Sequence, residues 1–136
     1  MNPEIEQNQR WRFVLTVLLV GYWCALFIST HIPMPKLGSL PQNSDKLMHF
    51  VAYAGLAFLL GARWSVSSPL TGKLAGKVFG ITAVYAVIDE LLQTIPFLHR
   101  TGDPFDALAD CIGSVIGLLL LFLVRTWFDR MQKQRS

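Results

Sequence analysis

Long blocks of apolar residues run through this chain, and their length restricts its fold more than any other feature. The blocks cover about 11–32, 46–64, 78–97 and 106–128, each close to the ~20 residues that an α-helix needs to cross a bilayer. Hydrophobic residues make up 52% of the chain and charged residues only 15%, against roughly 25% charged in an average soluble domain. The alternation that a membrane β-barrel requires is missing. We therefore predict an all-α fold, a four-transmembrane-helix bundle.

The polar segments outside these blocks predict one membrane domain, residues 11–128, between two short tails. The first tail is residues 1–10, and the second is the basic segment 129–136. The first apolar block lacks the small residues of a signal-peptide cleavage site at its end, so we expect it to be retained as a span. A proline-rich segment at 31–44 follows it and is expected to be an irregular loop, because prolines so spaced exclude a helix.

Basic residues are unequally divided between the two predicted ends of the bundle. One end holds Arg10, Arg12, Arg63, Lys73, Lys77, Arg125, Arg130, Lys133 and Arg135, and the other only Lys36, Lys46 and Arg100. By the positive-inside rule, both termini are expected in the cytoplasm. The basic residues form no continuous face, so a nucleic-acid partner is not expected. The expected partner is the lipid bilayer.

Polar and ionisable residues interrupt the apolar blocks at their predicted outer ends. A carboxylate inside a membrane span costs about 2.5–3.5 kcal/mol on insertion scales, so such residues are rare and usually functional. The ten residues of this set are Asp45, Lys46, His49, Asp89, Glu90, Gln93, Arg100, Asp103, Asp106 and Asp110.

Helical spacing places most of these residues in stripes. Residues four apart lie on one helix face, and the predicted orientation brings the stripes of three helices to the same outer end. The stripes are Asp45, His49 and Tyr53, then Asp89 and Gln93, then Asp106 and Asp110. We therefore predict a ligand-binding site between the helices, to which Lys46, Glu90 and Arg100 also contribute.

The carboxylates of this site cannot all stay ionised without cations or protons. Lys46, His49 and Arg100 are the cations that the chain itself offers. A divalent metal ion is an alternative partner, and its candidate ligands are His49, Asp89, Glu90 and Asp110. Arg100 and Lys46 also suit a phosphate headgroup. The sequence leaves these alternatives open.

Some of these residues have an equally good structural interpretation. Polar side chains in membrane bundles often join helices by hydrogen bonds, each worth about 0.6–2 kcal/mol. This structural role can explain Gln93, Tyr53 and Asp103. His31 and His99 are assigned to loops and have no predicted role.

Two motifs in these blocks carry a family resemblance. The first is Asp45-Lys46-x-x-His49-Phe50-x-x-Tyr53, and the second is Asp89-Glu90-x-x-Gln93 followed by Arg100, Asp106, Asp110, Gly113 and Gly117. In order and spacing they resemble the VanZ-like family of small membrane proteins. Asp110 stands where the family pattern commonly has Asn, and the segment between Pro96 and Arg100 is longer than usual. Gly113 and Gly117 also predict a GxxxG helix-packing face.

The resemblance implies a cell-envelope role at the outer face of a bacterial inner membrane. The family is named for a protein that raises resistance to the antibiotic teicoplanin, but the resemblance supplies no reaction. We expect binding of a lipid-linked envelope precursor or a phosphate headgroup. One alternative is a hydrolase or transferase with Glu90 or Asp89 as general base and His49 as acid or ligand. The other is an ion-coupled carrier, which would need a homo-oligomer because the chain shows no inverted repeat.

Overall fold

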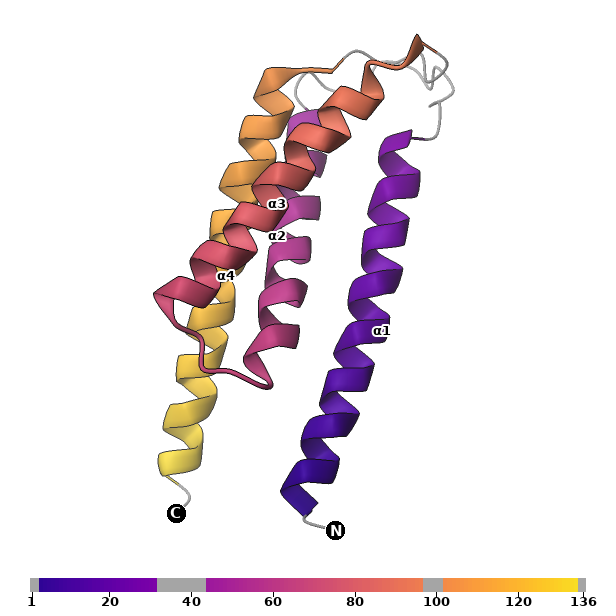
Figure 1. Cartoon of the computed structure of the whole chain (residues 1–136). Coiled ribbons are helices and arrows are strands. Elements are labelled where there is room, and N and C mark those ends of the chain that lie inside the picture. The colour runs from indigo at the N-terminus through magenta and orange to yellow at the C-terminus, as the bar shows by residue number, and fades with distance from the viewer. Residues whose placement is uncertain (1–2, 32–43, 97–101, 135–136) are drawn as a thin grey trace.

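A computed structural model describes residues 3–31, 44–96 and 102–134. These residues form four helices and no strand: α1 (Pro3–His31), α2 (Ser44–Ser65), α3 (Gly72–Gln93) and α4 (Pro104–Lys133). The helices lie side by side, and the beginning of α1 and the end of α4 lie at the same end of the bundle (Figure 1). The all-α bundle predicted from the sequence is confirmed.

Three of the four helices are long and apolar enough to cross a membrane: α1 over Ile5–His31, α2 and α4. The third helix, α3, is not among them, and it carries two lysines as well as Asp89 and Glu90. Large apolar side chains cover the outside of the bundle. Phe13 in α1, Val51 in α2 and Leu123 in α4 are between 57% and 71% exposed. Such a surface is stable only where lipid or another apolar phase covers it.

The first and last helices, α1 and α4, extend beyond the apolar blocks from which they were predicted. The N-terminal helix starts at Pro3, where a proline fits because the first helical N–H groups have no intrahelical partner. Most of the segment 1–10 is therefore helical. The C-terminal helix continues to Lys133 and includes most of the predicted tail 129–136.

The helix α3 begins and ends one to two turns earlier in the sequence than the predicted span 78–97. It begins at Gly72, and Thr71 caps it by accepting a hydrogen bond from the Leu74 N–H at 3.3 Å. It ends at Gln93, ahead of Pro96, whose ring disfavours helical geometry in the residue before it.

The second and fourth helices pack most closely, along the predicted GxxxG face. A Cβ on Gly113 would meet the backbone carbonyl of Phe50, and one on Gly117 would meet that of Ala54. The two backbones therefore touch where α4 has no side chains, as in other close helix pairs in membranes. This contact fixes how α4 is rotated against α2.

The first helix is attached to α2 by two side-chain bonds. The Tyr22 hydroxyl donates to the Ala52 carbonyl at 2.8 Å, and Gly55 leaves room for its ring. Nearer the termini, the Arg63 Nε donates to the Thr16 hydroxyl at 2.6 Å. The apolar core between the helices consists mainly of Leu19, Leu26, Tyr53, Leu56, Ala57, Leu60, Val78 and Ala86.

Candidate functional site

Polar side chains of α2 and α4 meet at the end of the bundle away from the termini. The Lys46 ammonium donates to Asp103 at 2.6 Å and to Asp106 at 2.9 Å. Asp103 is also the N-cap of α4, because its side chain accepts from the Phe105 N–H at 2.9 Å. The hydrogen bond from Lys46 lowers the pKa of the Asp103 carboxyl. One lysine thus joins the beginning of α2 to the beginning of α4.

A buried histidine–carboxylate pair lies one turn further into the bundle. The His49 Nδ1 of α2 is 3.1 Å from one Asp110 oxygen and 3.4 Å from the other. The Asp110 side chain is fully buried, and His49 is 8% exposed. With the proton on Nδ1, the ring donates to Asp110 and keeps the Nε2 lone pair for another partner.

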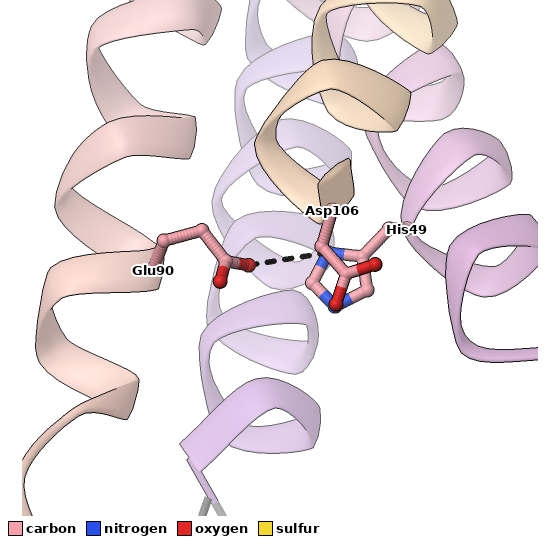
Figure 2. Close-up of side chains that lie close together, drawn as sticks. All are labelled: His49, Glu90 and Asp106. Atoms are coloured by element: carbon pink, nitrogen blue, oxygen red, sulfur yellow. Dashed lines mark ion pairs between the residues drawn. The ribbon is translucent and has the colours of Figure 1, made fainter. Parts of the chain in front are cut away.

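Glu90 brings α3 to this pair. Its Oε2 accepts a hydrogen bond from the Asp103 backbone N–H at 2.8 Å. Gly102 permits the close approach, since a Cβ there would meet the Glu90 carbonyl oxygen. The other oxygen, Oε1, is buried and lies 3.9 Å from the His49 Nδ1, with no hydrogen-bond partner in the part of the chain that the structure describes (Figure 2).

His49, Glu90 and Asp106 form a three-residue donor cluster from three helices. One ring nitrogen and one oxygen of each carboxylate all lie within 4.8 Å of one another, and Figure 2 shows the side chains converging. This set differs from the metal ligands predicted from the sequence. Asp106 takes the place of Asp110, which is bonded to the His49 Nδ1, and Asp89 lies in a separate cluster.

Asp89 joins α3 to α1 rather than to α2 or α4. It is fully buried, and its two oxygens accept from the Thr30 hydroxyl at 3.0 Å and the Gln93 amide at 3.3 Å. The His31 Nδ1 is 3.7 Å away. Sequence reasoning placed His31 in a loop and did not consider Thr30, but both belong to the last turn of α1. The available signal was that a buried aspartate requires a donor. His99 lies outside the described residues.

Two further predicted residues, Asp45 and Tyr53, do not belong to the donor cluster. Asp45 is exposed and accepts from the Lys46 backbone N–H at 2.9 Å. Tyr53 is fully buried deeper in the bundle, with its ring stacked on that of Tyr85 at 5.8 Å between centroids. Arg100 lies outside the described part of the chain.

The chain matches the VanZ/LLP1 family over residues 9–125, which is most of its length. It belongs to this family. The match includes every residue of the donor cluster and of the Asp89 cluster, so the resemblance suggested by the two motifs is confirmed. No curated protein and no solved structure matches the chain significantly.

An apolar rim surrounds the polar end of this VanZ/LLP1 protein. The rim residues are Leu47 and Met48 in α2, Leu91 in α3, and Phe105 and Leu108 in α4, each more than half exposed. They occupy the same helical turns as the ionisable residues but point outward. The acids and the histidine therefore lie inside an apolar collar, as they would near the boundary between lipid and water.

The VanZ/LLP1 site has an excess of negative charge among its described residues. Its carboxylates are Asp89, Glu90, Asp103, Asp106 and Asp110, and the facing basic side chains are Lys46, His31 and His49. The Lys46 ammonium is already shared by two acids, so it does not present a free positive charge to a phosphate. An anion alone is repelled here, whereas a cation, or an anion that brings one, is attracted.

Proposed function

We propose that this protein binds the headgroup of a lipid-linked envelope component at the outer face of the cytoplasmic membrane. The observation that carries the proposal is a buried polar cluster enclosed by exposed apolar side chains at one end of the bundle. A lipid can bring a polar headgroup to such a place while its chains stay in the bilayer. A small soluble molecule would gain nothing from the apolar collar.

An apolar groove beside the site suits the hydrocarbon part of that ligand. The groove has a volume of about 530 Å³ and lies between α1 and α3. Phe27 and Tyr85, which line it, come one helical turn before His31 and Asp89. A chain lying in this groove would therefore leave its headgroup at the polar end.

The direction of the site follows from the basic residues. Those near the termini, on the described ends of the helices, are Arg10, Arg12, Arg63, Lys73, Lys77, Arg125, Arg130 and Lys133. The positive-inside rule favours a cytoplasmic position for that end, which supports an outward-facing acidic end. An influence on glycopeptide resistance, including teicoplanin, would follow from a change in how envelope precursors are presented at this face.

The charge of the site selects the headgroup. A phosphate can approach these acids only with a cation between them, and a phosphate-bearing precursor with a divalent ion meets that requirement. The expected ligand is thus a polyprenyl phosphate or a related lipid phosphate bound together with an ion.

A second candidate function, hydrolysis or transfer on a lipid or glycan substrate, is favoured by one observation. The His49–Asp110 pair lies next to the unpartnered oxygen of Glu90, and such groups can exchange protons with a bound substrate. The two functions differ in how they respond to loss of the Glu90 charge.

Substituting Glu90 separates the two functions. With protein in nanodiscs containing a polyprenyl phosphate and enough divalent cation to saturate the variants as well, we expect Glu90→Gln to lower lipid retention by less than about 10-fold, because the amide oxygen still accepts from the Asp103 N–H. Glu90→Leu removes that acceptor and is expected to lower retention by more than about 10-fold, or ~1.4 kcal/mol. Native mass spectrometry measures the retained lipid. An enzyme with Glu90 as base would instead lose about 10²-fold or more of its turnover in Glu90→Gln.

The matched control is Glu6→Gln, an exposed glutamate on α1, which is expected to retain lipid as the unaltered protein does. Equal retention by the Glu90→Leu and Glu6→Gln proteins would contradict headgroup binding at this site. Release of phosphate or alcohol from the bound lipid, lost in Glu90→Gln, would establish the enzyme instead.

A further inference from the structure

We propose that His49, Glu90 and Asp106 form a binding site for a divalent metal ion that joins α2, α3 and α4. This inference deepens the proposed function, because the ion would connect the acids to a lipid phosphate. Its test, however, needs no lipid. The donor atoms lie within 4.8 Å of one another and come from three different helices.

The unpartnered oxygen of Glu90 is the independent sign of a missing cation. The Glu90 side chain is 9% exposed, and its buried Oε1 has no hydrogen-bond partner among the described residues. Buried polar atoms nearly always have a partner, and a buried carboxylate oxygen without one is costly. Glu90 Oε2 is bonded to the Asp103 N–H, which fixes the carboxylate so that Oε1 points toward His49 (Figure 2).

Asp110 prepares His49 for this role. Metal-binding histidines commonly donate their second ring N–H to a carboxylate, which fixes the ring and its tautomer. The His49 Nδ1 has such a partner in Asp110 at 3.1 Å, which leaves Nε2 for an ion. Glu90 Oε1 lies 3.9 Å from Nδ1, so the side chains must move slightly to place an ion between Oε1 and Nε2. Asp110 is accordingly a positioning residue and not a ligand.

Asp106 shares its carboxylate between the lysine and the ion. Its Oδ1 accepts from Lys46 at 2.9 Å, and one of its carboxylate oxygens belongs to the donor cluster. The residue is 7% exposed and begins α4 together with its neighbours. Metal binding would therefore draw the beginning of α4 toward the end of α3.

The donor set favours Zn²⁺, with Mn²⁺ next, over Ca²⁺. One imidazole and two carboxylates match the mixed ligands of zinc sites that keep an open position, whereas Ca²⁺ takes six to eight oxygens. Donors at about 2.0–2.2 Å from Zn²⁺ lie about 3–3.5 Å apart. The donor atoms of the three side chains must therefore move about 1 Å closer together to bind the ion. The open position can accept a phosphate oxygen of the lipid.

The test uses the full-length protein without a polyhistidine tag, in detergent and free of added lipid. Co²⁺ alone serves as the spectroscopic probe and Zn²⁺ as its competitor. We expect one Co²⁺ per chain with visible d–d absorption, displaced by Zn²⁺, and a higher melting temperature with Zn²⁺ than with a chelator. Glu90→Gln and Asp106→Asn are each expected to weaken binding by about 10²-fold or more.

Two further variants separate ligands from surrounding residues. Asp45→Asn removes an exposed carboxylate from the first turn of α2 and is expected to leave Co²⁺ affinity unchanged. Asp110→Asn keeps an acceptor for the His49 N–H, so only a small loss of Co²⁺ affinity is expected. Asp110→Leu removes the acceptor and should weaken Co²⁺ binding by about 10–100-fold. Circular dichroism of each protein shows that its helices are formed.

Equal Co²⁺ affinity in Asp106→Asn and Asp45→Asn, or no Co²⁺ binding by the folded protein, would overturn the metal site. Failure of the metal site with lipid retention intact leaves the proposed function standing. A metal bound by these three residues in a protein that retains no lipid would support the metal site and contradict the proposed function.

Discussion

Replacing Gly117 with leucine is expected to destabilise the bundle by about 3 kcal/mol or more. A Cβ at this position would meet the carbonyl oxygen and carbon of Ala54, which belong to the backbone of α2. A side chain could rotate away from such a clash, but a helix backbone cannot. The two helices would have to separate, and the lysine and histidine bonds between them would be lost. A thermal melt in detergent, followed by helical circular dichroism, measures the effect.

The matched control is Gly80→Leu in α3. Gly80 is exposed, and a Cβ there meets no heavy atom within 4 Å. Leucine has a better helix propensity than glycine, so this protein is expected to melt at or above the temperature of the unaltered chain. Similar melting of the Gly117→Leu and Gly80→Leu proteins would show that α2 and α4 do not pack backbone to backbone.

Replacing His49 with leucine is expected to cost about 3–5 kcal/mol, because it leaves the Asp110 carboxylate buried without its partner. Among the described residues, His49 is the residue that bonds to the Asp110 side chain. The double variant His49→Leu with Asp110→Leu removes both groups together. It is expected to recover most of the lost stability, since a buried pair replaced by apolar side chains is often neutral.

This double-mutant cycle is measured by thermal or denaturant melts in a chelating buffer, so that metal binding does not contribute. A coupling between the two sites of at least ~2 kcal/mol is expected for a buried bonded pair. If the two single substitutions simply add, His49 and Asp110 do not interact, and the arrangement in which Asp110 orients the histidine is wrong.

The sequence predicted the helices well because the apolar blocks are long and strongly hydrophobic. It predicted their ends less well. The stretch from Gly72 to Lys77 lies outside the predicted span 78–97, yet a cap at Thr71 and helix-compatible side chains let α3 begin there. Residues 3–9 are likewise helical although they are mostly polar. Polarity marks where an apolar block ends, whereas a helix can continue beyond it into the headgroup region.

The site could be predicted in part because spacing within one helix determines which residues share a face. His49, Glu90 and Asp106 were all in the predicted set, and the structure brings them together. Spacing says nothing about rotation between helices. Asp106 and Asp110 lie on the same face of α4, and the packing of Gly113 on α2 sets the rotation at which Asp106 joins the donor cluster and Asp110 bonds to His49.

The contribution of α1 could not be predicted from spacing at all. Thr30 is a small polar residue at the end of an apolar block, and such residues usually bond to their own helix. Its hydroxyl does lie near carbonyls of α1, but it also reaches Asp89 on α3 at 3.0 Å. Only the packing of α1 against α3 shows this contact.

The proposed headgroup site depends on the acidic end facing the outside of the membrane, and a cysteine-labelling experiment tests this most directly. In a protein whose native Cys24 and Cys111 are changed to alanine, Asp45→Cys places a thiol at the acidic end and Asp129→Cys places one near the end of α4, both on exposed positions. A membrane-impermeant maleimide added to intact spheroplasts is expected to label position 45 at once and position 129 only after permeabilisation. Labelling of position 129 in intact spheroplasts, with position 45 protected until permeabilisation, would place the site in the cytoplasm and contradict an outer-face headgroup site.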